Sequence, residues 1–199
     1  MTHSGDTRAA GNRPPTGERT LLRGHFLVAM PQLKDPNFEQ TVVLLCEHGE
    51  DGALGVVVNR PTPLLLGQIY EGQGIEGTGG EDEPIHYGGP VQPEMGFVLH
   101  EGGEYEGSLP VVGDLRLGTS LEILRDIAAH RGPRRFLFFL GYAGWAPDQM
   151  EQEIARNDWL VVPADPELLF AVPAEKRWEE AIRILGIDPS LLSQQFGTA

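Results

Sequence analysis

The apolar residues in the first half of the chain occur in short runs, which are typical of β-strands. Each run is rich in valine, leucine or phenylalanine and is bounded by glycine, proline or charged residues. The third run ends before Pro61, because a proline has no N–H to donate to a sheet. The runs predict strands over residues 26–29, 38–47, 54–59, 85–87, 96–100 and 109–112.

Two local features indicate how the second and third strands are placed. Residues 49–52, Gly-Glu-Asp-Gly, have the composition of a tight turn and predict a β-hairpin. Residues 56–58 are three consecutive valines, without the alternation of apolar and polar residues that a half-buried strand shows. We therefore expect the third strand to be central in a sheet, with both faces covered.

The second half of the chain carries helical periodicity. Ser120 predicts the cap of a helix that ends at Gly132. A later amphipathic helix is predicted by apolar residues at i, i+3, i+4 and i+7, which are Trp178, Ala181, Ile182 and Leu185. Strands over 135–140 and 159–162, and helices that start near Pro147, at Pro166 and after Asp188, complete the pattern. Strands first and helices concentrated in the C-terminal half favour a single-domain α+β fold over a doubly wound sheet.

Two segments lack any apolar periodicity. Residues 71–84 are glycine-rich and acidic, and we expect a mobile loop there. Residues 1–20 are rich in glycine, proline, threonine and arginine, and they predict a disordered tail before a domain over 21–199.

The charge of the chain narrows the choice of partners. The 29 acidic and 15 basic side chains give a formal net charge of −14, which repels nucleic-acid phosphates and acidic lipids. Arg131, Arg134 and Arg135 form the only local basic cluster, and we expect them to pair with surface carboxylates. No apolar stretch approaches the roughly 20 residues of a membrane helix, and no secretory signal is evident. The cytoplasm is therefore the expected location, and no membrane partner is predicted.

The usual signatures of catalysis and cofactor binding are missing from the sequence. Cys46 lies in an apolar run and is expected to be buried and inert, although His48 could share its strand face. Residues 72–77 match G-x-G-x-x-G, but neither a preceding strand nor a following helix is predicted, so we reject a dinucleotide site. The spacing of His48, His86 and His100 fits no compact metal motif. We predict no catalytic residue, no metal and no cofactor.

Glycine-containing turns are the most unusual local sequences. They lie at residues 59–61, 88–91 and 141–145, where glycine permits close approach of a ligand or of another backbone. Tyr142 and Trp145 add side chains that are enriched at binding sites. One interpretation is a set of tight corners plugged by aromatic rings, and the other is a binding cleft. The candidate cleft residues are Asn59, Arg60, Gly88, Gly89, Pro90, His100, Gly141, Tyr142, Gly144, Trp145, Gln149 and Glu153.

These turns belong to an ordered set of motifs that resembles the YqgE/AlgH family of bacterial proteins. The motifs are residues 24–31 (Gly-His-Phe-Leu-Val-Ala-Met-Pro), 35–38 (Asp-Pro-Asn-Phe), 41–45, 52–61, 88–91, 96–100 and 140–145, with His48, Gln149, Glu151 and Glu153. The resemblance covers nearly everything after Leu21. It implies one α+β domain with coiled, branched, mostly antiparallel β-sheets. Some members carry the label of transcriptional regulator, and the family supplies no catalytic residues to transfer.

Three functions stay open at this point. We favour a non-enzymatic regulatory or protein-interaction module, because catalytic motifs are missing and the charge is acidic. The alternative is a small-molecule-binding protein or enzyme with a cleft between the turns at 88–90 and 141–145, in which His100 or Glu153 would be the acid or base. Direct DNA binding ranks last, because the net charge has the wrong sign.

Overall fold

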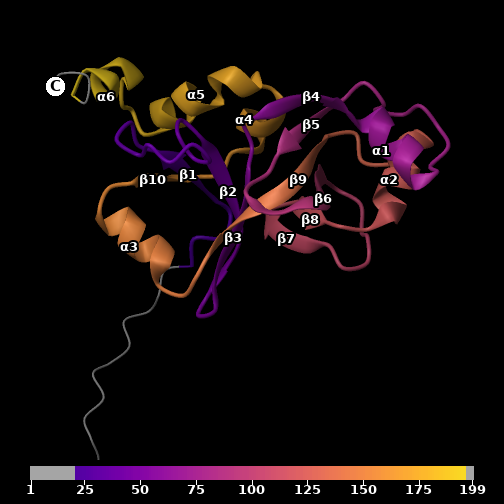
Figure 1. Ribbon diagram of the computed structural model, residues 1–199, viewed down its shortest axis with the longest axis horizontal. Coiled ribbons are helices and arrows are strands. Elements are labelled where there is room, and N and C mark those ends of the chain that lie inside the picture. The colour runs from indigo at the N-terminus through magenta and orange to yellow at the C-terminus, as the bar shows by residue number, and fades with distance from the viewer. Residues whose placement is uncertain (1–20, 196–199) are drawn as a thin grey trace, which may run out of the picture.

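One long strand, β9 (Phe136–Trp145), joins the two halves of the molecule (Figure 1). Its first part pairs with β6 (Val91–Glu101) on one edge and with β5 (Pro84–Tyr87) on the other, and its last part pairs with β3 (Gly52–Val57). The computed structural model describes residues 21–195, so the tail predicted over 1–20 lies outside the described residues.

The sheet is branched and mostly antiparallel. Its strand order is β10-β1-β2-β3-β9-β6-β8-β7, while β4 and β5 branch from β9, and the β5–β9 pair is parallel. This architecture confirms the predicted α+β class. The remaining strands are β1 (His25–Ala29), β2 (Val42–Gly49), β4 (Pro61–Leu65), β7 (Leu109–Val112), β8 (Leu115–Gly118) and β10 (Trp159–Pro163).

The helices cover different parts of this sheet. α4 (Pro166–Phe170) and α5 (Arg177–Ile184) supply side chains to the largest core cluster, on one face of β1–β3. α3 (Gln149–Ala155) covers the opposite face of these strands. α1 (Leu66–Gln73) and α2 (Leu121–Ala128) pack on β5, β6 and β9. The short helices η1 (Ala174–Lys176) and α6 (Pro189–Gln195) complete the described chain.

Several local predictions are confirmed. Residues 49 and 52 pair across the β2–β3 hairpin. The valines at 56–58 divide between the clusters on the two faces of the sheet, as expected for a central strand. Ser120 caps α2, since its Oγ accepts a 3.1 Å hydrogen bond from the Glu122 amide. In α5, Trp178, Ala181 and Ile182 are buried, whereas Leu185 is 39% exposed just beyond the helix.

The strand limits near two prolines differ from the prediction. Residues 38–41 form a turn and not the start of a strand, because Asp35 accepts the Asn37 amide (2.8 Å) and Gln40 has a left-handed φ of 54°. β3 ends at Val57, before Pro61 as predicted, but Pro61 begins a further strand, β4, that the sequence pattern did not predict. A proline is tolerated there because β4 pairs only with β5 and so lies at a sheet edge.

The prediction of a loop over residues 71–84 is wrong at both ends, which belong to α1 and β5. Between them the chain packs against α2: the Gly79 amide donates to the Ala128 carbonyl (2.9 Å), and the Tyr70 hydroxyl donates to the Gly79 carbonyl (2.8 Å). A Cβ on Gly79 would lie 1.9 Å from the Ile127 carbonyl oxygen, so only glycine fits. Gly74 ends α1 with φ 62°. The G-x-G-x-x-G sequence at residues 72–77 therefore begins in the last turn of a helix, whereas a dinucleotide site needs it at the start of one.

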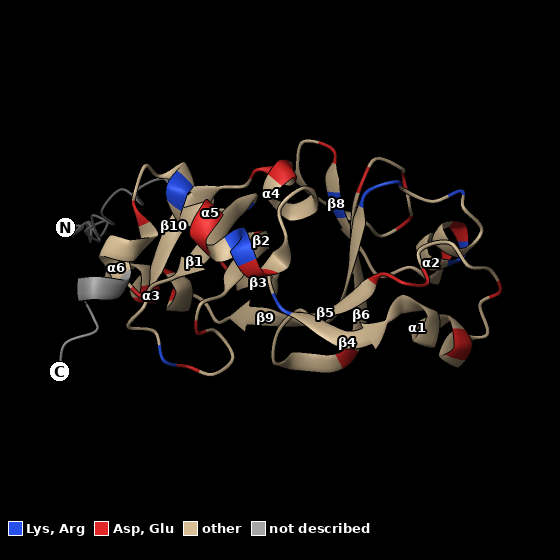
Figure 2. Ribbon diagram, turned by 90° about the horizontal axis from the view of Figure 1, so that it is seen from above, with Lys and Arg blue, Asp and Glu red and all other residues tan. Residues whose placement is uncertain are grey.

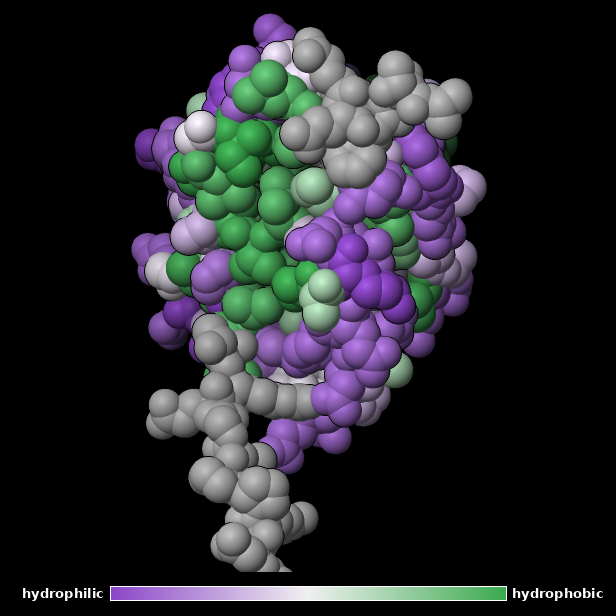
Figure 3. Space-filling view, turned by 90° about the vertical axis from the view of Figure 1, so that its left-hand side faces the viewer, coloured by the Kyte–Doolittle hydropathy of each residue, from purple (hydrophilic) through white to green (hydrophobic). Residues whose placement is uncertain are grey.

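The side of the molecule with α3, α6 and β10 carries a continuous apolar surface (Figure 3). β10 is the last strand in the sheet order, so its outer edge pairs with no other described strand. Exposed apolar patches of this kind are typical of contact surfaces.

Candidate functional site

The predicted glycine turns at 88–91 and 141–145 meet where the chain crosses β9. β5 and β6 pair with opposite edges of β9, so the residues between them pass over that strand. A Cβ on Gly88 would lie 2.1 Å from the Gly141 carbonyl oxygen, and one on Gly89 would lie 2.2 Å from the Tyr142 carbonyl carbon. Gly141 has φ 73°, which bends β9 without ending it, so the turn predicted at 141–145 is part of a continuous strand. Backbone atoms thus fill the space between the two turns, and Pro90 is exposed directly after the crossing.

Asn59 and Arg60 hold a neighbouring loop. The Asn59 Oδ1 accepts from the Val42 amide (2.8 Å), and its Nδ2 donates to the Gln40 carbonyl (2.9 Å). The Arg60 guanidinium donates to three backbone carbonyls of residues 36, 37 and 39 at 2.8–2.9 Å. These two side chains therefore bond to backbone groups of the turn before β2, and none of these bonds goes to the glycine turns at 88–91 and 141–145.

His100 lies away from the other candidate residues. It pairs with Phe136 at the start of β9, it is fully buried, and its Nδ1 contacts the Gly102 carbonyl (2.8 Å). Burial lowers its pKa, while the Gly102 contact acts in the opposite direction. Its Nε2 has no hydrogen-bond partner, and its ring packs edge-on against Tyr105.

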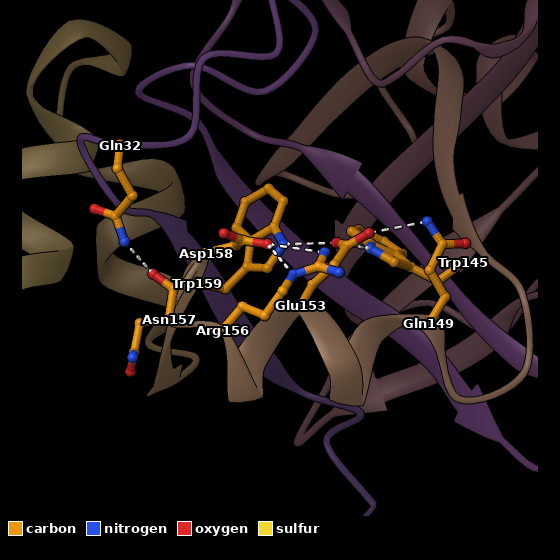
Figure 4. A network of polar contacts seen from close by, with 8 residues as sticks. All are labelled: Gln32, Trp145, Gln149, Glu153, Arg156, Asn157, Asp158 and Trp159. Atoms are coloured by element: carbon orange, nitrogen blue, oxygen red, sulfur yellow. Dashed lines mark hydrogen bonds and ion pairs between the residues drawn. The ribbon is translucent and has the colours of Figure 1, made fainter.

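Trp145, Gln149 and Glu153 form a polar network between β9, α3 and β10 (Figure 4). The Glu153 Oε2 accepts hydrogen bonds from the indole Nε1 of Trp145 and of Trp159, both at 2.9 Å. Its Oε1 accepts from the Gln149 amide (2.9 Å). Trp145 and Trp159 also pack edge-on at 6.0 Å between ring centroids. Oε2 therefore ties α3 to β9 and β10, whereas the Oε1 contact stays within α3.

A groove opens beside β9, on the side reached by Tyr142 and Gly144. We call it the β9 groove, and it has a volume of about 450 Å³. Leu54, Val91 and Tyr142 form an apolar floor, and the carboxylates of Glu47 and Asp51 stand at its rim. The lining residues are Glu47, His48, Gly49, Asp51, Gly52, Ala53, Leu54, Val91, Tyr142, Gly144 and Trp145. Of the residues predicted from the sequence, only Tyr142, Gly144 and Trp145 belong to it.

A β-bulge in β2 places the charged residues of this groove. The pairing of β2 with β3 shifts between Leu45 and Glu47, so Cys46 stays in the core while Glu47 is exposed. His48 also lines the groove, but both of its ring nitrogens are engaged: its Nδ1 accepts from the Leu22 amide (2.9 Å), and its Nε2 contacts the Glu151 carboxylate (3.0 Å). His48 therefore does not act on Cys46. A bulge depends on the partner strand, which explains why the sequence pattern did not indicate Glu47.

Cys46 is buried, as predicted, and its thiol contacts the Leu44 carbonyl at 3.5 Å. Desolvation raises the pKa of this thiol far above its usual range, which keeps it protonated. Within residues 21–195 no three His, Cys, Asp or Glu side chains gather as a metal site would require. None of the described helices is long and apolar enough to span a membrane.

Positions occupied by Lys or Arg are fewer along the ribbon than positions occupied by Asp or Glu (Figure 2). Two members of the predicted arginine cluster pair with carboxylates, as expected: Arg131 with Asp126 (3.1 Å), and Arg135 with Glu101 (3.2 Å) and Glu167 (2.7 Å).

Comparisons with known proteins agree with this fold. The family profile described as AlgH-like matches residues 26–190. A UPF0301 protein of Ralstonia nicotianae is 50% identical over 89% of this chain and 95% of its own length. A UPF0301 protein of Burkholderia vietnamiensis is 46% identical over 92% of this chain and 97% of its own length.

Two solved structures share the architecture. The AlgH protein from Pseudomonas aeruginosa is 44% identical, with a TM-score of 0.75 over 94% of this chain and 100% of that protein. A protein from Corynebacterium diphtheriae is 22% identical, with a TM-score of 0.67 over 88% of this chain and 89% of its own, and it supports the fold alone. By profile, sequence and fold, this chain belongs to the AlgH-like family.

Proposed function

We propose that this protein is a non-enzymatic interaction module that holds a segment of a protein partner in the β9 groove. The observation that carries the proposal is the combination of an apolar floor with the exposed carboxylates of Glu47 and Asp51. A floor of this kind accepts an aliphatic or aromatic side chain, and rim carboxylates favour lysine or arginine beside it. The formal net charge of −14 also attracts basic partners over distance.

The polar network below the groove supports binding over catalysis. Trp145 lines the groove and is held in place by its hydrogen bond to Glu153. A side chain that is already fixed loses little conformational entropy when a partner binds. The apolar face around β10 offers a further contact area for a larger partner. The cytoplasm is the location in which we expect this interaction, and a regulatory role would act through the bound protein and not through DNA.

Trp145→Ala is a poor test, because Trp145 is 94% buried and its loss would unfold the region. Gly144→Val is better, since Gly144 is exposed and a Cβ there has only ordinary contacts, the nearest at 3.4 Å from the Tyr142 ring. The added side chain would occupy the groove without straining β9. The probe is a displayed library of random peptides selected on the wild-type protein.

We expect selected peptides to carry Lys or Arg beside an apolar residue and to bind Gly144→Val about tenfold more weakly. Asp51→Lys should weaken them about three- to tenfold, and more so at low salt. Glu50→Lys is the matched control: it lies in the same turn and makes the same charge change, but it does not line the groove. Peptides that bind Gly144→Val as tightly as the wild type would refute the groove as the binding site.

A further inference from the structure

A second cavity, of about 430 Å³, lies on the other side of the molecule, between β4, β5, the start of β9 and the helices α4 and α5. Its walls include the apolar side chains of Leu137, Leu169 and Phe170. Three arginines also line it, although basic residues number only 15 in this acidic chain. They are Arg134, Arg135 and Arg177, and we call this space the arginine cavity.

Arg177 is a buried cation without a carboxylate partner. It is 6% exposed, its Nε donates to the Val172 carbonyl (3.0 Å), and its Nη1 donates to the Val58 carbonyl. No carboxylate of the described residues forms an ion pair with it, and both of these hydrogen bonds go to backbone carbonyls. Desolvation lowers its pKa to about 10, so it stays charged at neutral pH. The charge of the exposed Glu175 acts against this lowering, but the hydrogen bonds of the guanidinium go only to neutral carbonyls, which leaves positive charge for an anion to neutralise.

His86 brings a second buried polar group to the same cavity. It is 3% exposed, and its Nδ1 is buried without a hydrogen-bond partner. Burial and, to a smaller extent, the charge of Arg177 lower the pKa of His86 to about 4, against the opposing effect of the nearby Pro84 and Phe138 backbone, so the ring is neutral at pH 7. A neutral imidazole has one N–H and one lone pair, so it can bond to an anion oxygen or to a ligand hydroxyl. Buried polar groups almost always have a partner, and this one lines a cavity where a ligand could supply it.

The remaining charges define the mouth of the cavity. Arg134 is exposed and forms no ion pair with any described residue. Arg135 is already bound to Glu101 and Glu167, and it lies 4.7 Å above the Phe170 ring. The exposed Glu83 and Glu175 also line the mouth, so the positive charge is greatest inside, at Arg177.

We propose that the arginine cavity binds a small organic anion, with its carboxylate or phosphate group on Arg177, Arg134 and His86 and its apolar body against Leu169 and Phe170. The cavity volume lies within the range of small-molecule sites, which is about 300–1,000 Å³. This inference does not rest on the proposed function, because the arginine cavity and the β9 groove share no residue.

The test is a titration of the full chain with benzoate, phenyl phosphate and inorganic phosphate, followed by NMR of the histidine rings and arginine side chains. We expect saturable shifts of the His86 and Arg177 signals with benzoate or phenyl phosphate, and the stronger of the two identifies the anionic group. Inorganic phosphate should bind more weakly, because it lacks the apolar body. Absence of saturable binding of all three anions below about 10 mM would overturn the proposal.

Two variants and one control separate this site from general electrostatics. Arg134→Gln should weaken binding about three- to tenfold, as for a partly exposed charge contact. His86→Phe removes the unpartnered nitrogen, and we expect it to fold and to bind at least about tenfold more weakly. Arg131→Gln makes the same charge change a few residues from Arg134 but outside the cavity, and it should change the Kd less than twofold. Equal weakening by Arg131→Gln and Arg134→Gln would refute the site.

Discussion

Replacing Glu153 by alanine should destabilise the whole domain, although the residue lies on a short helix at the surface. Its Oε2 is the acceptor for the indole N–H groups of Trp145 and Trp159, which are 6% and 3% exposed. Alanine leaves two buried donors without partners, and each costs about 1–3 kcal/mol. The Gln149 contact is exposed and adds little. The expected loss in free energy of unfolding is therefore about 2–6 kcal/mol, which is a large part of the stability of a typical domain.

Glutamine at the same position is the matched comparison. Its amide oxygen can occupy the place of Oε2 and accept from both indoles, so only the added strength of a charged acceptor is lost. We expect Glu153→Gln to cost about 1 kcal/mol, several times less than Glu153→Ala. The assay is urea unfolding followed by tryptophan fluorescence, with m-values compared among the three proteins. A loss below about 1 kcal/mol for Glu153→Ala, or equal losses for the two variants, would refute the view that this carboxylate anchors the two indoles.

Three further predictions follow from buried groups and close contacts. Since the pKa of His86 falls from 6.5 in the unfolded chain to about 4 in the fold, the unfolded state binds more protons between these values, and stability should fall by about 3 kcal/mol as pH drops from 7 to 4. Urea titrations of wild type and His86→Phe at several pH values check this, and equal slopes would contradict it. Gly88→Ala should prevent folding or lower the free energy of unfolding by several kcal/mol, because its Cβ would lie 2.1 Å from the Gly141 oxygen. Gly72→Ala has open space around it in α1 and should raise the free energy of unfolding by up to about 1 kcal/mol. Thermal melts should show opposite shifts in Tm for the two variants, and a stable Gly88→Ala would contradict the close approach. The buried thiol of Cys46 should react with a thiol reagent only as fast as the protein opens, so a rapid reaction in native buffer would contradict its burial.

The elements that could be predicted from the sequence are those whose causes are local. The hairpin at residues 49–52, the Ser120 cap and the apolar face of α5 each depend on neighbours within a few residues. The buried thiol was also predictable, because the four residues before it in β2 are all apolar. The acidic charge is a property of composition and needs no structure.

The candidate site depended on contacts between distant segments. Glycine at 88 and 141 indicated a close approach, but its small size does not say what approaches, and the answer is backbone instead of a ligand. Glu153 suggested an acid or base until its two indole partners were located.

Only the tertiary structure brought together the groups of the arginine cavity. His86 and Arg177 lie far apart in sequence, and neither stands in a motif. Propensity, turn chemistry and periodicity are encoded in neighbouring residues, so they can be recognised before the fold is known. Burial, strand pairing and the shape of a cavity depend on which segments come into contact. These contacts form only when the strands of the branched sheet pair on both edges of β9.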